Sequence, residues 1–360
     1  MAIVIALAVT ETTSFGVLYY GFGTFLPSME RSLGWSKLAL TGAFSIALLV
    51  AGVAGVAVGH HLDHHRPQVV MTIGSVVAAA GTLGWSYAES PVAFYAIWVL
   101  IGLAMSAVLY EPAFIVLARR FEGDDRRKAL TAVTLLAGLA STIFVPLEEK
   151  LIRELGWRPA LRVLALVLFA VTVPLHAFVL RDRPKPADRV GPETANHAGT
   201  AEPASLTIHH AVRDQRFWYL LGAGVLLAMT VATLTAHQLA FLQERGWSAR
   251  SAAAAIGAIG LWQVGGRLVF APIGRWVSSR TVTVGVYLCQ VVALGVLAWS
   301  SGPVAIFVYV AGTGLSRGMY TLVRATLVVT RPRAYRHGRT TRSCAPIIVT
   351  QLAPNERLCS

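Results

Sequence analysis

The sequence predicts an all-α polytopic membrane protein, and three observations lead to this prediction. Of the 360 residues, 55% are hydrophobic and only 14% are charged, whereas soluble domains carry about 25% charge. The mean hydropathy is +0.60. The apolar residues form blocks without charge, such as 38–58 and 281–300, and about 20 such residues cross the hydrocarbon core as a helix. These features exclude a soluble enzyme, a secreted disulfide scaffold and a disordered chain.

We expect about ten membrane spans. The first begins almost at Met1 with no basic stretch before it, so it should remain in the membrane as its own insertion signal. The expected spans cover residues 2–26, 38–58, 69–88, 92–118, 129–147, 160–180, 217–242, 251–272, 281–300 and 303–329.

The distribution of basic residues predicts the orientation. With the N-terminus inside, the cytoplasmic segments hold 20 Lys and Arg residues and the external loops hold 8. Cytoplasmic loops of membrane proteins collect Lys and Arg, so this excess explains the net charge of +13 better than nucleic-acid binding does. We therefore expect a plasma (inner) membrane protein with both termini in the cytoplasm.

A polar linker divides the chain. Residues 181–215 are rich in Pro, Ala, Asp, Glu and Arg and hold too few apolar residues to build a core. We expect an N-terminal six-helix bundle over 1–180, a flexible cytoplasmic linker over 181–215 and a four-helix bundle over 216–330. A basic segment that does not span the membrane follows over 331–360.

An internal repeat supports this division. Residues 33–36 (LGWS) precede the second span, and residues 245–248 (RGWS) precede the eighth, at an offset of 212. Repeated helical halves around a central linker are typical of secondary transporters. The repeat also predicts two more spans beyond 341, where the chain instead carries six arginines after residue 330. This favours a truncated or frameshifted end, with a native basic tail as the alternative.

The motifs resemble those of the major facilitator superfamily over about residues 1–330. Gly59, Asp63 and Arg66 match its loop signature between the second and third spans, and Gly156-Trp157-Arg158 follows the fifth span. The resemblance implies a two-bundle fold with twelve helices, of which about ten are present here. It also implies a gating role for Gly59, Asp63 and Arg66, with the glycine allowing two helices to cross closely.

Within the superfamily, the chain is most similar to monocarboxylate and oxalate/formate carriers. The similarity rests on the aromatic-glycine run Tyr19 to Phe22, on Tyr110-Glu111-Pro112 and on Gly266-Arg267. In those carriers an arginine of the eighth span binds the substrate carboxylate, a role that the resemblance places on Arg267. An acid stands four residues earlier in some of them, and here that position is Gln263.

Ionisable side chains inside spans are costly and therefore candidate functional groups. They are Glu11, Glu111, Arg267, Arg317 and Arg324. Four of these five lie on spans 1, 4 and 10, which line the central cavity in the family fold.

Each candidate has a functional and a structural interpretation. Arg267, with Gln263 and Arg317, could bind an anionic substrate, since guanidinium matches carboxylate; the alternative for Arg267 is an ion pair between helices. Glu11 could carry a coupling proton because burial disfavours a charged carboxylate, or it could hydrogen-bond to the neighbouring hydroxyls. Glu111 is a second proton-coupling candidate, or it pairs with Arg317 across the cavity.

Other sites are less well supported. His60, His61, His64 and His65 have spacings that could hold zinc, but the loop signature already explains them, so we expect no metal or other cofactor. Thr230, Thr233, Thr235 and His237 are further polar residues of the seventh span. Neither a phosphate-binding loop nor a Ser/His or metalloprotease pairing is present in the sequence, so an enzyme is not expected.

The sequence therefore predicts a monomeric secondary transporter, in the lipid bilayer, of a small monocarboxylate-like organic anion. It should be a proton symporter that works by alternating access, with no nucleic-acid partner. Drug export is the alternative within transport. A membrane sensor or an inactive fragment is the alternative of another class.

Overall fold

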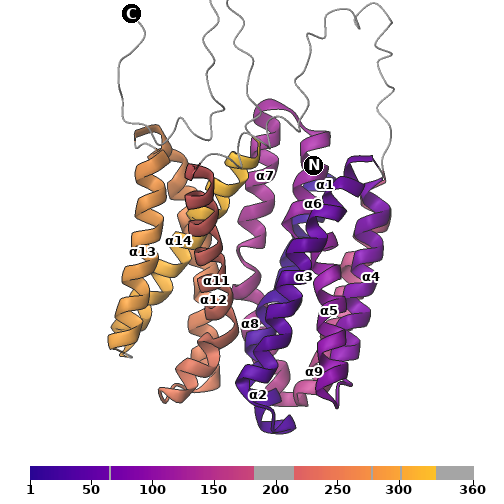
Figure 1. The fold of residues 1–360 in the computed structure, drawn as a ribbon, viewed down its shortest axis with the longest axis vertical. Helices are drawn as coiled ribbons and strands as arrows, with labels where there is room; N and C mark the ends of the chain where they lie inside the picture. Colours follow the sequence, from indigo (N-terminus) through magenta and orange to yellow (C-terminus); the bar gives the residue numbers. More distant parts are fainter. Residues whose placement is uncertain (65, 182–214, 277–278, 301, 330–360) are drawn as a thin grey trace, which may run out of the picture. The chain divides into compact units, whose positions relative to one another are not determined.

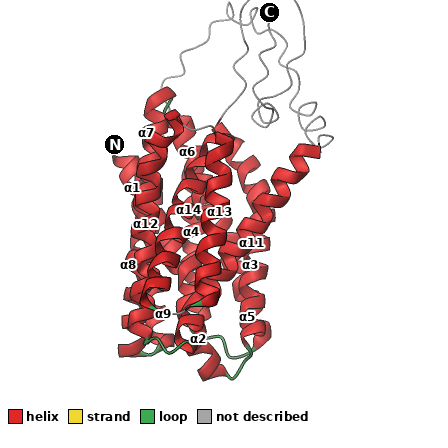
Figure 2. Cartoon of the chain, turned by 90° about the vertical axis from the view of Figure 1, so that its left-hand side faces the viewer, coloured by secondary structure: helices red, strands yellow, loops and turns green. Residues whose placement is uncertain are grey.

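The computed structural model describes residues 1–64, 66–181, 215–276, 279–300 and 302–329. All regular secondary structure in these ranges is helical, and no strand occurs among them (Figure 2). Residues 1–181 and 233–325 form one compact unit. The described part of a second unit is the first part of α11 and the last residues of α14.

The helices of the first unit run side by side (Figure 1). In chain order they are α1 (Ala2–Ser14), the π-helical η1 (Phe15–Tyr20), α2 (Gly21–Leu33), α3 (Lys37–His64), α4 (Pro67–Trp85), α5 (Pro91–Val108), α6 (Tyr110–Arg120), α7 (Gly123–Ala137), α8 (Ala140–Leu155), α9 (Trp157–Pro174), the π-helical η2 (Leu175–Val179), α11 (Gln215–Glu244), α12 (Ala249–Trp276), α13 (Ser279–Trp299) and α14 (Pro303–Val329).

These helices confirm the all-α polytopic prediction. Within the described residues, nine helical segments are long and apolar enough to cross a membrane, and α14 adds a further helix of 27 residues. Apolar side chains also lie on the outside of the bundle, as lipid contact requires: Leu49, Val53 and Val56 of α3 are each more than two-thirds exposed. The predicted linker and the segment after residue 329 lie outside the described residues.

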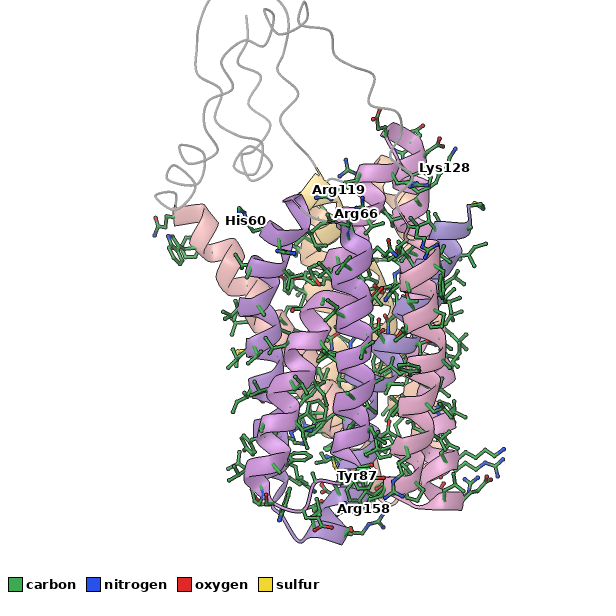
Figure 3. All side chains as sticks on the ribbon, turned by 90° about the vertical axis from the view of Figure 1, so that its right-hand side faces the viewer. His60, Arg66, Tyr87, Arg119, Lys128 and Arg158 are labelled. Atoms are coloured by element: carbon green, nitrogen blue, oxygen red, sulfur yellow. The ribbon has the colours of Figure 1, made fainter. Side chains whose placement is uncertain are left out.

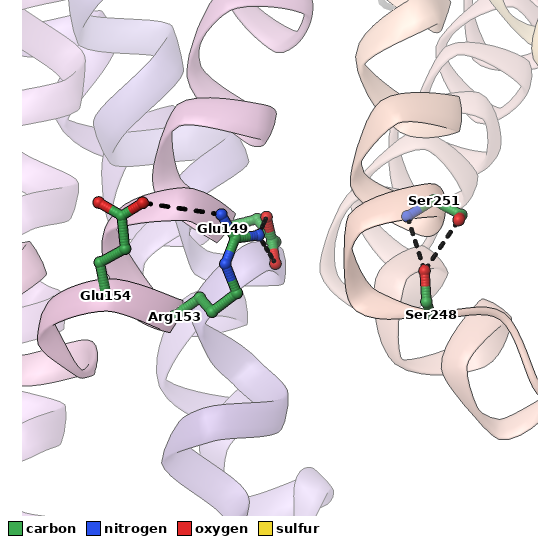
Figure 4. Close-up of polar contacts among 5 residues, drawn as sticks. All are labelled: Glu149, Arg153, Glu154, Ser248 and Ser251. Carbon is green, nitrogen blue, oxygen red and sulfur yellow. Dashed lines mark hydrogen bonds and ion pairs between the residues drawn. The ribbon is translucent and has the colours of Figure 1, made fainter.

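The predicted repeat has the same local structure in both copies. Gly34 and Gly246 both adopt a positive φ, of 69° and 88°, where a side chain would be strained. Two residues later a serine caps the next helix: Ser36 Oγ accepts a hydrogen bond from Ala39 N at 3.2 Å, and Ser248 Oγ accepts one from Ser251 N at 3.1 Å (Figure 4). The Gly-Trp-Ser motif thus ends one helix and starts the next in each half.

Aromatic side chains fill the core of the first half. Phe22 and Phe44 stack with ring centroids 4.6 Å apart, and Trp85 meets Trp98 edge-on at 4.8 Å. All four side chains are almost completely buried. This cluster joins α2, α3, α4 and α5 into one packed body.

The Gly-Trp-Arg motif after the fifth span holds the neighbouring loop. The Arg158 guanidinium donates hydrogen bonds to the carbonyl oxygens of Ser86 at 2.8 Å and Ala88 at 3.1 Å. These carbonyls follow the end of α4, where a positive group is favourable. Figure 3 places Arg158 and Tyr87 at one end of the helices, here called the Arg158 end, and His60, Arg66, Arg119 and Lys128 at the opposite end, here called the basic end.

The fifth span is longer than predicted. We expected residues 129–147, ending before two acids and a lysine, but the apolar helical segment runs from Gly123 to Leu155. The charges did not end the helix because Glu148 and Glu149 are buried against other helices. This difference brings Glu148 into the interior of the bundle.

Candidate functional site

The fourth span is broken beside the predicted site. Leu109 has an extended backbone (φ −92°, ψ −167°) between α5 and α6. Pro112, which cannot donate a backbone hydrogen bond, lies in the first turn of α6. As a result Glu111 also lies in this first turn, where the helix dipole favours a negative charge.

The first and fifth spans are irregular as well. The π-helical segment Phe15–Tyr20 interrupts the first span, and Gly138 with Leu139 separates α7 from α8 in the fifth. Phe15 of the π-helical segment contacts Tyr110 beside the break in the fourth span, with ring centroids 4.5 Å apart. Broken helices of this kind surround substrate sites in many secondary transporters, and π-helical turns are frequent at functional sites.

Arg267 and Gln263 face these irregular segments. They lie one turn apart on α12, so their side chains share a face. Both are buried, at 2% and 5% exposed. The Arg267 guanidinium interacts with the Tyr110 hydroxyl, and Gln263 Nε2 lies 3.4 Å from the Tyr20 hydroxyl oxygen. The structure thus brings together the two α12 residues predicted to bind substrate.

Glycines set the position of α12 on both sides. Toward α8, a Cβ on Gly260 would lie 2.7 Å from the Gly138 carbonyl oxygen, and the Thr142 hydroxyl donates to the Gly257 carbonyl at 2.7 Å. Toward α14, a Cβ on Gly266 would lie 3.0 Å from the Cα of Leu315. Small residues allow membrane helices to approach this closely. The close contacts determine where along the bundle the Arg267 side chain lies.

The guanidinium of Arg267 has unused hydrogen-bonding capacity. Its Nε and Nη1 atoms are buried and have no hydrogen-bond partner in the described part of the chain. Leaving buried charged donors unsatisfied costs several kcal/mol by rough estimate, so these atoms are suited to receive an anion. A carboxylate can accept two parallel hydrogen bonds from one guanidinium.

Glu11 lies on α1 and is completely buried. Neither of its oxygens has a hydrogen-bond partner within the described ranges. The neighbouring hydroxyls do not hold it: Thr12 donates to the Ala8 carbonyl at 2.7 Å and Thr13 to the Val9 carbonyl at 2.9 Å. The predicted alternative, a hydrogen bond between Glu11 and the neighbouring hydroxyls, is not seen among the described residues.

Glu111 is exposed, and it interacts electrostatically with Glu11. Arg317 is buried on α14, at 7% exposed, and interacts with Tyr19 and Tyr309. The Tyr309 hydroxyl also donates to Gln238 Oε1 at 2.9 Å. The predicted pair of Glu111 with Arg317 stays a prediction.

The remaining candidates are placed as follows. On the seventh span, Thr235 interacts with the Tyr19 hydroxyl, whereas the Thr230 hydroxyl bonds to its own helix at the Leu226 carbonyl. The Arg324 side chain lies outside the described residues. A group of three or more side chains able to hold a metal is not found where side chains are described; His64 and His65, two of the four histidines considered for zinc, lie outside that part.

The predicted gating loop is described only in part. Arg66 is exposed at the basic end, and the Asp63 side chain is outside the described residues. None of the described atoms lies within 4 Å of a Cβ built on Gly59, so the close helix crossing expected there is not seen. The contact that the structure does show near the end of α3 is a hydrogen bond from the Arg119 guanidinium to the Leu62 carbonyl oxygen.

Sequence reasoning missed Glu148. The expected fifth span ends at residue 147, just before Glu148. In the structure its side chain is completely buried on α8. Helical spacing gives the missed signal, since Glu148 lies four residues after the buried Phe144 and therefore on the same face.

Comparison with known proteins identifies the family. The family model of the Major Facilitator Superfamily matches residues 9–341. The chain belongs to this superfamily. Its members are transporters and not enzymes, in agreement with the sequence analysis.

Two curated relatives are similar to this superfamily member. Human monocarboxylate transporter 12 is 23% identical over 315 residues, which cover 80% of this chain and 57% of the relative. The oxalate:formate antiporter of Oxalobacter formigenes is 24% identical over 178 residues, covering 49% of this chain and 42% of the relative. The chain thus spans about half the length of these curated relatives.

A solved structure shows the same fold. The nucleoside transporter NupG, in a mutant form, superposes with a TM-score of 0.69 at 13% identity, covering 92% of this chain and 84% of that chain. The likeness confirms the predicted major facilitator fold.

Proposed function

We propose that this superfamily member is a secondary active transporter of a small monocarboxylate-like organic anion. The observation that carries the proposal is the buried Arg267 guanidinium, with two nitrogen atoms that lack partners among the described residues. The Tyr110 hydroxyl beside it and the Gln263 amide one turn away add neutral polar groups. A small carboxylate is bound well by one cation that donates to both of its oxygens, with a few polar groups around it.

The names of two relatives support the same substrate class. One is called a monocarboxylate transporter and the other an oxalate:formate antiporter. Both names refer to small carboxylates. We assign the substrate of this chain to that class, with Arg317 as a second cation of the site.

We further propose that transport is coupled to protons through Glu11 and Glu111. Glu11 is buried without a hydrogen-bond partner in the described ranges, and the charged group interacting with it is another acid. A buried carboxyl group with a second acid nearby is more stable in its protonated form. Proton binding here would offset the negative charge that the substrate brings.

The experiment is uptake into liposomes containing the purified chain. Labelled lactate, pyruvate, formate and oxalate are offered with and without a proton gradient. We expect Arg267→Ala to abolish uptake and Arg267→Lys to recover little of it, because lysine cannot bind bidentately. Arg153→Ala is the matched control, since Arg153 is half exposed and pairs with Glu149. Uptake that survives Arg267→Ala would remove the assigned role.

Glu11→Gln separates coupling from binding. We expect this variant to exchange substrate across the membrane but to lose accumulation driven by a proton gradient. Glu89→Gln, at an exposed loop position, is its control. Export of amphipathic drugs that carboxylates do not inhibit would favour the alternative transporter class, and ligand binding without flux would favour a sensor.

We also propose that the protein is a monomer in the plasma membrane with both termini in the cytoplasm. The clustering of His60, Arg66, Arg119 and Lys128 at the basic end (Figure 3) supports this orientation, because positive residues collect on the cytoplasmic side. Labelling of single cysteines at positions 66 and 89 with an impermeant reagent tests it. In intact cells, only position 89 should react.

A further inference from the structure

We propose that Glu148 is a second proton-binding site, separate from Glu11, at the interface of α8 with η1 and α2. The role of Glu148 in the transport cycle rests on the proposed transport function, whereas the geometry of the site does not. Its geometry stands independently: the side chain is completely buried, and neither carboxyl oxygen has a hydrogen-bond partner in the described part of the chain.

The π-helical segment makes room for Glu148. On α8, Phe144 and Glu148 are four residues apart and share a face. The residues that receive them are Gly16, which lies against the Phe144 ring, and Gly21, whose Cβ would lie 3.0 Å from Glu148 Oε1. These two glycines are five residues apart, the spacing of a π-helical turn. Without this turn, Tyr20 and not Gly21 would face the carboxyl group.

The part of η1 and α2 that faces Glu148, which the structure describes throughout, holds no cation. The Thr24 hydroxyl is the polar group there that interacts with the Glu148 carboxyl group, and it also donates to the Tyr20 carbonyl oxygen at 3.4 Å. The Tyr20 hydroxyl faces Gln263 of α12. Arg31, farther along α2, donates to the Pro27 carbonyl of its own helix.

The arginines of α8 and α9 make their contacts elsewhere, and Lys150 of α8 is exposed. On α8, Arg153 pairs with Glu149, its Nη1 lying 2.9 Å from Oε2 (Figure 4). On α9, Arg158 bonds to carbonyl oxygens of the loop after α4, and Arg162 lies over the Tyr87 ring. A buried carboxylate without a paired cation is costly, so the protonated form is compatible with this site.

Movement of the two halves would bring water within one helical turn of Glu148. One helical turn, Gly21 to Thr24, lies between Glu148 and α11 of the second half. Gly21 faces Glu148, while a Cβ on Gly23 would lie 3.1 Å from the Thr235 carbonyl carbon. Separation of α11 from this turn would leave a single helical turn covering the carboxyl group. The proton could then be exchanged each time the Arg158 end opens.

The first test labels the wild-type protein with a hydrophobic carbodiimide, which reacts with protonated carboxyl groups in apolar surroundings. Mass spectrometry of the peptide that contains residues 148 and 149 gives the modified position. We expect modification of Glu148 to decrease as the pH rises, while Glu149, paired with Arg153, stays unmodified. Modification that is absent or does not change with pH would overturn the proposal. This test needs neither a variant nor a known substrate.

The second test uses transport by Glu148→Gln, with Glu149→Gln as the matched neighbour. We expect Glu148→Gln to keep substrate exchange. Its proton-driven accumulation of substrate should be about tenfold lower than in the wild type, equivalent to about 1.4 kcal/mol. Glu148→Asp, which restores a carboxyl group, should recover part of the pH dependence. An unchanged pH profile in Glu148→Gln would overturn the proposal. If instead the wild-type chain moved no carboxylate, the proposed function would fail while the labelling result still stood.

Discussion

The guanidinium group of Arg267 lies against the Cα of Gly138, in the space where any larger side chain at position 138 would begin. Gly138 is also where α7 ends and the fifth span is interrupted. One glycine therefore allows both the break in this span and the approach of the candidate substrate-binding cation from α12. The two halves of the chain meet at this contact.

Substitution of Gly138 should move Arg267 without removing it. In Gly138→Ala the new methyl group would displace the guanidinium, and we expect the KM for carboxylate uptake to rise about tenfold, a loss of about 1.4 kcal/mol. Gly265→Ala is the control, because a Cβ there meets nothing within 4 Å. Equal KM values in the two variants would show that the contact with Gly138 does not position the arginine.

The packing of α3 against α5 depends on Gly102. A Cβ on Gly102 would lie 2.9 Å from the Cα of Ala47, and this backbone cannot move aside easily. Gly102→Val should lower the free energy of unfolding by about 1–3 kcal/mol through overpacking. The thermal midpoint in detergent measures the effect. Gly52→Val, on the open side of α3, should leave the midpoint within about a degree or two; a similar decrease in both variants would contradict the assignment.

The Arg158 guanidinium should be required for the loop between α4 and α5. Its two terminal nitrogens donate to two carbonyl oxygens at 2.8 and 3.1 Å. Lysine has a single nitrogen and cannot reproduce this pair of hydrogen bonds. We expect Arg158→Lys to destabilise the protein by about 2 kcal/mol, as for hydrogen bonds from charged groups. Arg162→Lys keeps a cation over the Tyr87 ring and should cost less. The thermal midpoint of Arg158→Lys should be lower than that of Arg162→Lys, and the opposite order would contradict this prediction.

An ion pair between Lys37 and Glu244 joins the start of α3 to the end of α11. Both side chains are more than a third exposed, so the pair should contribute little to stability. Its position at the Arg158 end is more informative, because it links the two halves. With Cys289, Cys344 and Cys359 replaced by alanine, the variant Lys37→Cys/Glu244→Cys should be cross-linked by a bis-methanethiosulfonate reagent, which forms one disulfide with each cysteine, and the cross-link should stop uptake.

A reducing agent should restore uptake in the cross-linked variant. The two single-cysteine variants should transport normally with and without the reductant, because neither can form the cross-link. Full uptake in the cross-linked double variant, with the cross-link verified by mass spectrometry, would show that the halves need not separate at this end.

Local sequence features predicted the helices well because each depends on nearby residues. The limits of most spans agree with the apolar blocks, since the membrane requires an unbroken run of apolar residues. The glycines and serines of the two Gly-Trp-Ser copies form matching turns and caps, as an internal repeat predicts; the division into two bundles stays a prediction. The fifth span is the exception, because its apolar block ends at residue 147 while the helix continues to Leu155 with Glu148 and Glu149 buried.

The sequence alone determined that this chain is an all-helical membrane protein and placed Arg267 and Glu11 inside spans, because hydropathy and the cost of charge in lipid are properties of the chain itself. Only the tertiary structure decided which groups meet: Arg267 with Gly138, Gln263 with Tyr20, and Glu148 with Gly21. These contacts depend on glycines and helix breaks on different spans coming to the same depth. The sequence of a single span does not determine which residues of other spans lie at the same depth, because this depends on packing between helices.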